Sequence, residues 1–205
     1  MAEQIDISRA EPRHAAGLAA LFGSNGFGCS CRYWHFQGTN REWLDRCAHE
    51  PETNRRESEA ALLAGSPEMS GFVAETHAGV LVGWLKVAPA ASMAKLYEQR
   101  LYKGLPCFGQ DRSGVFTIGC LLVREDFRHR GIARALLGGA VEAAPSFGAR
   151  ALEAFPRSDA DVADAGLMLG PLRLFQAAGF EIVNDFYPYP VLRRTFAETD
   201  RGAAP

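Results

Sequence analysis

Residues Val123 to Ala133 read VREDFRHRGIA, and the segments on either side of this stretch decide the expected fold. The preceding run, Val115 to Val123, is nearly all apolar and predicts a strand at the centre of a sheet. In the following segment apolar residues recur every three or four positions, which predicts a helix with one buried face. The stretch is therefore expected to form a strand-to-helix corner that carries three basic side chains between positions 128 and 130.

Such a corner has the features of an anion-binding site. If the helix begins near Arg130 or Gly131, its first backbone N–H groups have no intrahelical partner and point back at the loop. The helix dipole adds partial positive charge, and Arg128, His129 and Arg130 add side-chain donors. Gly131 has no Cβ, so a phosphate group can approach its backbone closely. An ordinary polar loop is the alternative, but the pattern favours a ligand that carries a pyrophosphate.

Strands and helices alternate along the rest of the chain and predict one mixed α/β domain. Strands are expected at 5–8, 72–75, 80–87, 151–155, 180–186 and 189–194. Helices are expected at 12–22, from 39 through 44, from 54 to 65, at 92–101 and at 167–178. The domain is expected to span 1–197, with its core at 72–195, and to end in a flexible tail at 198–205.

The composition is that of an ordinary globular protein. Of the 205 residues, 47% are hydrophobic and 22% are charged, and the formal net charge is -2. This small net charge argues against nucleic acid or an anionic membrane surface as partner. The start, MAEQIDISRA, has no basic-then-apolar leader, and no apolar run is long enough to span a bilayer. Five irregularly spaced cysteines indicate reduced thiols, so a cytoplasmic location is expected.

In this context the corner resembles that of the GNAT superfamily of acyl-CoA-dependent N-acyltransferases, in which it holds the coenzyme A pyrophosphate. Leu174 to Phe180, LFQAAGF, is similar to the family signature LYxxxGF, and Leu152 to Ala154 lies where the family has its next strand. The resemblance implies a single GNAT-like domain with a mixed, mostly antiparallel central sheet and helices on both faces. It also implies transfer of an acetyl group from acetyl-CoA to a primary amine, by direct attack in a ternary complex. The acceptor is then a small molecule or a peptide N-terminus, and a homodimer is one option for the assembly.

The resemblance also implies which residues contact the coenzyme. They are Leu121, Leu122, Val123, Arg128, His129, Arg130, Gly131, Ile132, Ala133, Arg134 and Phe175. A backbone N–H near Leu122 or Val123 is expected to hold the thioester carbonyl oxygen. Glu153 is the candidate catalytic base, because some family members carry a glutamate in a similar strand. A purely structural ion pair of Glu153 is the alternative.

One departure from the family concerns the proton donor. Family members often have a tyrosine at the position of Phe175, close to the departing thiolate, and phenylalanine cannot donate a proton. Cys120, Tyr187 and Tyr189 are other candidate donors. The missing tyrosine keeps a second function open, that of a non-catalytic acyl-CoA-binding sensor module.

The segment GCSCRYWH, residues 28–35, allows three interpretations. A zinc site is one of them, with the ligands Cys29, Cys31, Cys47 and His49. Each pair is separated by one residue, whereas structural zinc ligands are usually separated by about two to four, so a metal-free protein is expected. Core packing of the cysteines is the ordinary alternative.

The third interpretation follows from the resemblance, because in the family the segment after the first helix lies over the acceptor side of the thioester. The acceptor pocket is then expected to have an aromatic wall made of Tyr33, Trp34 and Phe36.

Overall fold

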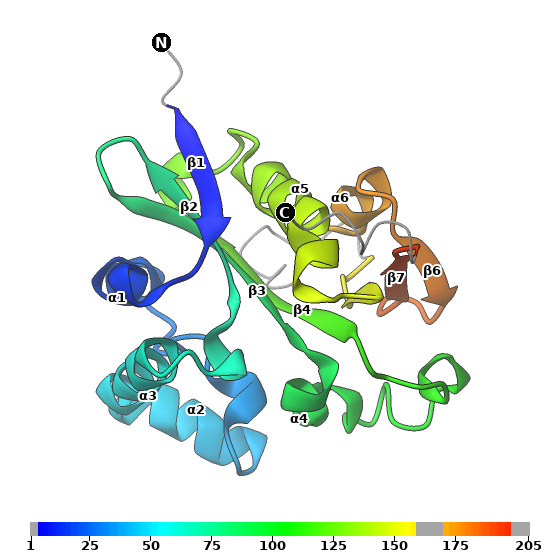
Figure 1. Cartoon of the computed structure of the whole chain (residues 1–205). Helices are drawn as coiled ribbons and strands as arrows, with labels where there is room; N and C mark the ends of the chain where they lie inside the picture. Colours follow the sequence, from blue (N-terminus) through cyan, green and yellow to red (C-terminus); the bar gives the residue numbers. More distant parts are fainter. Residues whose placement is uncertain (1–3, 159–169, 198–205) are drawn as a thin grey trace.

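A computed structural model describes residues 4–158 and 170–197, and a seven-stranded sheet forms its centre (Figure 1). The strand order is β1-β2-β3-β4-β5-β7-β6. The strands are β1 (Ile5–Arg9), β2 (Gly71–Thr76), β3 (Leu81–Pro89), β4 (Val115–Val123), β5 (Ala151–Ala154), β6 (Glu181–Asn184) and β7 (Val191–Thr195). Every neighbouring pair is antiparallel except β4 and β5, which are parallel. The predicted mixed, mostly antiparallel sheet is confirmed.

Helices cover both faces of the sheet, as predicted (Figure 1). One face carries α1 (Ala15–Gly23) and α3 (Pro51–Leu63), whose apolar residues pack against Trp84 and its neighbours. The other face carries α5 (Ile132–Ala143) and α6 (Leu172–Ala177). The remaining helices are α2 (Asn40–His49), α4 (Ala94–Tyr97) and the 3-10 turns η1 (Pro12–His14), η2 (Tyr33–His35), η3 (Pro67–Met69), η4 (Ala90–Met93), η5 (Pro106–Phe108), η6 (Glu125–Phe127) and η7 (Ala144–Phe147). In the part of the chain that the structure describes, no helix has the length and apolar character to cross a membrane.

Several expected helices differ from those observed. The helix predicted from 39 through 44 continues to His49 in α2, and α6 begins only at Leu172, so residues 170 and 171 of the helix predicted at 167–178 are not helical. The helix predicted at 92–101 is only one turn, α4, because Met93, Leu96 and Tyr102 pack into one small core cluster that a straight helix would not bring together. The helix predicted to begin at 54 begins at Pro51, whose fixed φ suits the first helical position. Residues 167–169 of the last predicted helix and the predicted tail at 198–205 lie outside the described residues.

The sheet opens between β4 and β5. The two strands pair only where Val115–Thr117 face Ala151–Glu153, although β4 continues to Val123. On its other edge β4 pairs with β3 from Phe116 to Val123, with a bulge at Gly119. No described strand pairs with residues 118–123 on the open edge, and unpaired backbone donors and acceptors of this kind are a template for an extended ligand.

The glycine at the bulge leaves room for a neighbouring side chain. A Cβ on Gly119 would lie 2.4 Å from the terminal methyl group of Met93, which is itself fully buried. A bulge bends its strand and disturbs the regular ladder. The bend in β4 therefore lies close to the point where its pairing with β5 ends.

Candidate active site

The corner after β4 leaves a helix N-terminus open. His129 and Gly131 have φ values of 60° and 82°, in the left-handed region, so the chain turns sharply before α5 begins at Ile132. Gly131 is the N-cap of α5, and no side chain caps this end. A Cβ on Gly131 would meet no atom within 4 Å. The first N–H groups of α5 are therefore available to a ligand, as the sequence predicts.

A cavity of about 470 Å³ lies beside this corner and follows the open edge of β4. Its lining comes from four parts of the chain. These are Cys120–Val123 of β4, the corner residues Phe127–His129 and Gly131–Arg134, the residues Gly170, Pro171, Arg173, Leu174 and Ala177 around α6, and the residues Phe22, Asn25, Phe27, Cys29, Ser30 and Cys31 of α1 and the loop after it. Its volume is within the range of small-molecule and cofactor sites.

The structure brings nine of the eleven predicted coenzyme-contacting residues to this cavity. Arg130 is not among them, and its guanidinium lies over the ring of Phe127, at 4.8 Å from the ring centroid. Phe175 is fully buried and packs edge-on against Phe180. An apolar ring has no polar atom to direct at a ligand, and Phe175 lies in the core behind the cavity wall.

The loop after α1, residues 24–39, stands out in the sequence only as a long and aromatic segment, and it supplies one wall of the cavity. Phe27, Cys29, Ser30 and Cys31 of this loop, and Phe22 before it, were not predicted to line the coenzyme cavity. The length of the loop and its richness in cysteine and aromatic residues were the available signal.

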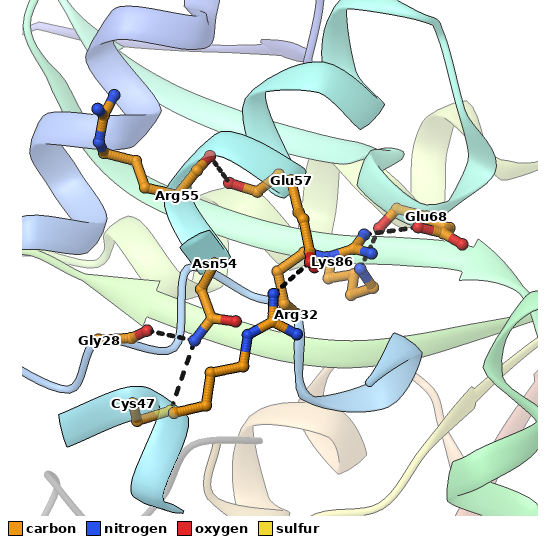
Figure 2. Close-up of polar contacts among 10 residues, drawn as sticks. Gly28, Arg32, Cys47, Asn54, Arg55, Glu57, Glu68 and Lys86 are labelled. Carbon is orange, nitrogen blue, oxygen red and sulfur yellow. Dashed lines mark hydrogen bonds and ion pairs between the residues drawn. The ribbon is translucent and has the colours of Figure 1, made fainter. Parts of the chain in front are cut away.

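A partly buried polar network anchors this loop (Figure 2). Arg32 pairs with Glu57 of α3 at 3.3 Å and with Glu68 of η3 at 2.5 Å. The side-chain amide of Asn54 donates to the carbonyl oxygen of Gly28 at 2.8 Å. Lys86 of β3 donates to the backbone carbonyl of Glu68 and is fully buried. The loop is therefore tied directly to α3 and η3, and η3 is tied in turn to β3 of the sheet.

Glu153 lies in the sheet where β4 and β5 separate, and its side chain is fully buried. Arg112 donates to both carboxylate oxygens at 2.7 Å, Arg193 donates to Oε1 at 2.7 Å, and the hydroxyl of Tyr97 donates to Oε2 at 2.7 Å. Burial alone would raise the pKa of Glu153, but the hydrogen bonds from Arg112 and Tyr97 hold this pKa below its ordinary value. A carboxylate held in this way is a weak proton acceptor. The contacts are those of the structural ion pair, the alternative role for this residue.

The three predicted acceptor-wall residues lie in one aromatic cluster, in which the ring centroids of Tyr33 and Trp34 are 4.7 Å apart, but their other contacts differ. Trp34 donates its indole N–H to the carbonyl oxygen of Gly119 at 2.7 Å, which places it against the bulge of β4. Tyr33 and Phe36 instead pack on Trp43 of α2, with ring centroids 5.5 and 5.2 Å apart. None of the three lines the cavity beside the corner. Trp34 alone contacts the open strand.

The four residues considered for zinc do not form a ligand set. Within residues 4–158 and 170–197, no group of three or more His, Cys, Asp or Glu side chains is arranged to hold a metal ion. All five cysteines are free thiols. His49 lies on the surface, 3.6 Å from Asp45, and Cys47 accepts a weak hydrogen bond from Asn54.

A sheet of this order that opens beside a helix N-terminus is the arrangement expected for the GNAT fold. The model of the acetyltransferase (GNAT) family matches residues 37–180, so the chain belongs to this family. No curated protein sequence matches the chain.

Solved structures show the same fold. A GCN5-related N-acetyltransferase from Kribbella flavida is 15% identical, with a TM-score of 0.56, and the match covers 94% of this chain and 98% of the other. The GNAT-family N-acetyltransferase YhbS from Escherichia coli, solved with CoA, is 16% identical with a TM-score of 0.53, covering 99% and 87%. A GNAT-family acetyltransferase from Brucella melitensis, solved with acetyl-CoA, is 15% identical with a TM-score of 0.51, covering 95% and 90%.

Proposed function

We propose that the protein transfers an acetyl group from acetyl-CoA to a primary amine, by direct attack of the amine on the thioester in a ternary complex. One observation carries the proposal: a single cavity connects the uncapped N-terminus of α5 to the unpaired edge of β4. An extended ligand with an anionic end fits both features. Two of the structural neighbours were solved with CoA or acetyl-CoA, which agrees with this choice of ligand.

Each part of the coenzyme has a place in this proposal. The pyrophosphate accepts hydrogen bonds from the first turn of α5, with Arg128, His129 and Arg134 close by. The amides of the pantetheine arm pair with the free backbone groups of β4, in the manner of an added strand. The thioester then lies near Cys120, and a backbone N–H at Leu122 or Val123 stabilises the developing negative charge on its carbonyl oxygen.

The acceptor approaches from the side of the loop at 24–39, where Trp34 contacts the bulge. We propose a small-molecule amine or a peptide N-terminus as acceptor. An alkylamine with a pKa near 10.4 costs about 4–5 kcal/mol to present as the neutral nucleophile at pH 7, so a proton acceptor near the thioester is needed. Five free thiols agree with the proposed cytoplasmic location.

The test has two arms. In the first, acetyl-CoA should raise the melting temperature of the protein, because a ligand that binds only the folded state stabilises it. In the second, a library of small amines and peptide N-termini is screened for acetylated product and released CoA by mass spectrometry. Binding without turnover of any acceptor would support the acyl-CoA sensor in place of the enzyme, and no binding would reject both.

A further inference from the structure

Cys31 lines the cavity and is held in an unfavourable backbone conformation. Ser30 and Cys31 have φ values of 44° and 60°, in a region that L-residues other than asparagine and aspartate rarely adopt. The contacts of Arg32 and Asn54 fix the chain on either side (Figure 2). Strained residues of this kind persist where the surrounding structure over-determines them, and they concentrate at functional sites.

The sulfur of Cys31 accepts hydrogen bonds. The indole N–H of Trp84 donates to it at 3.2 Å. Interaction with the neighbouring Cys120 thiol, together with the charge of the fully buried Lys86, outweighs burial and lowers the pKa of Cys31 to about 6. The same interaction, together with burial, raises the pKa of Cys120. The N–H of Trp84 and the charge of Lys86 therefore both favour the thiolate form of Cys31 over its thiol form.

The other ionisable groups around Cys31 do not compete for this role. Burial raises the pKa of Cys29 to about 11, so Cys29 stays protonated at neutral pH. Burial lowers the pKa of His35 to about 4, so His35 is neutral. The charged groups facing this region are Lys86 of β3, Arg32 of the loop, Glu57 of α3 and Glu68 of η3.

The cavity holds few groups that can exchange a proton. Among the described residues that line it there is no aspartate, glutamate, tyrosine or lysine. The ionisable side chains are arginines, His129 at the corner, and the three thiols of Cys29, Cys31 and Cys120. His129 lies at the end of the cavity proposed for the pyrophosphate, whereas Cys120 is the cavity-lining residue of β4 farthest along the strand from the corner. The thiols are thus the proton-exchanging groups at the reacting end.

We infer that Cys31 and Cys120 form the acid–base pair of the transfer reaction, Cys31 as proton acceptor and Cys120 as proton donor. This inference rests on the proposed function and names the groups that would accept the amine proton and protonate the departing CoA thiolate. The amine nitrogen forms a bond to the acetyl carbon, the bond between that carbon and the CoA sulfur breaks, and the amine proton passes to the Cys31 thiolate. Cys120 gives its proton to the departing CoA thiolate, and Cys31 then returns a proton to Cys120. The sum is amine plus acetyl-CoA giving amide plus CoA, with no other reactant.

The first test uses turnover. Cys31→Ser should lower kcat by about 10²–10⁴-fold, the usual contribution of a general base, with the KM for acetyl-CoA nearly unchanged. With an acceptor amine that is neutral over the whole pH range, kcat/KM of the parent protein should rise as pH rises through about 6, and the variant should lose this rise. Cys107→Ser, outside the cavity, is the matched control and should keep the parent kinetics. An unchanged turnover rate and pH profile in Cys31→Ser would overturn the inference.

The second test does not need turnover. The pH titration of thiolate ultraviolet absorbance, taken as parent minus Cys31→Ser, should have its midpoint near 6. Trp84→Phe removes a donor to the sulfur and should move this midpoint to higher pH. A midpoint near the ordinary cysteine value of about 8.5 would overturn the inference.

The outcomes also separate this inference from the proposed function. A parent protein that acetylates amines while Cys31→Ser and Cys120→Ser do so equally well disproves the acid–base pair alone. A parent protein that turns over no amine disproves the proposed function and the pair together. An acetyl adduct on Cys31, formed from acetyl-CoA without amine, would show attack of the thiolate on the thioester and overturn its role as base.

Discussion

The indole N–H of Trp34 donates to the carbonyl oxygen of Gly119 at 2.7 Å, and so joins the loop after α1 to the bulge of the central strand. The contact spans 85 positions of the sequence. It occurs where β4 has just lost β5 as a neighbour. The loop therefore contacts the backbone at the point where the sheet opens.

Replacing Trp34 should change acceptor binding more than coenzyme binding. Trp34→Ala removes both the ring and its hydrogen bond to Gly119, so we expect the KM for the acceptor to rise several-fold more than the KM for acetyl-CoA. Trp34→Phe, which keeps a ring, should give a smaller change. Steady-state kinetics with each substrate varied in turn measure this, and Tyr33→Phe, which loses only a hydrogen bond to Asn40, is the control. An equal rise in both KM values would contradict the placement of the acceptor beside Trp34.

Charge at Gly131 should abolish coenzyme binding. Asparagine and aspartate both tolerate the left-handed conformation at this position, and there is space for either side chain. Gly131→Asp places a carboxylate where the pyrophosphate is proposed to bind, whereas Gly131→Asn has nearly the same shape without the charge. We expect acetyl-CoA to raise the melting temperature of the Asn variant and not that of the Asp variant. Equal stabilisation of the two variants would refute the placement of the pyrophosphate.

Loss of the carboxylate at Glu153 should act mainly on stability. Glu153→Ala leaves Arg112 and Arg193 without their shared partner beside a fully buried site, and removal of one member of a buried ion pair costs about 3–5 kcal/mol. We expect a fall of this order in the free energy of unfolding, measured by denaturant titration. The substitution Glu98→Gln at an exposed carboxylate should have little effect.

Glu153→Gln separates the structural role from the catalytic one. The variant keeps the shape of the side chain and should lower stability, while the turnover rate of the folded fraction changes by less than about tenfold. If the turnover rate instead falls by about two orders of magnitude or more at parent stability, Glu153 is the base, the role that the family resemblance implies.

The purified protein should contain no structural metal. Cys31 lies in the core beside Trp84, while His49 is on the surface, so the four residues do not converge. Elemental analysis should find no stoichiometric zinc, and a chelator should leave the melting temperature unchanged. Stoichiometric zinc that is lost together with the fold would disprove this prediction.

The fold and the corner could be predicted because their signals are local. The run Val115 to Val123 is predicted as a strand, and β4 has the same first and last residues. The prediction succeeds because a strand that is covered on both faces of a sheet has an almost continuous apolar sequence. The next helix is predicted to begin near Arg130 or Gly131, and Gly131 is its N-cap. The LFQAAGF segment correctly marks the end of α6, although Phe175 packs inward and does not reach the cavity.

The roles of single residues could not be predicted because they depend on distant partners. The partners of Glu153 come from positions 97, 112 and 193, and no local pattern reports that all three converge on one carboxylate. Cys31 likewise acquires its character from Trp84 and Lys86 of β3 and Cys120 of β4. Composition singles out the loop, but only the fold places its sulfur in the cavity.

The short pairing of β4 with β5 divides the sheet into two blocks, β1–β4 and β5–β7, that share three residue pairs. A coenzyme bound along the open edge would contact both β4 and the residues around α6. It would thereby add contacts between the two blocks, which the chain itself joins through only the short β4–β5 pairing. Amide hydrogen exchange should then slow on both sides of the junction when acetyl-CoA is added, including in β5 and β7, strands that do not line the cavity. The coenzyme would thus stabilise the junction between the two blocks of the sheet as well as serve as a substrate.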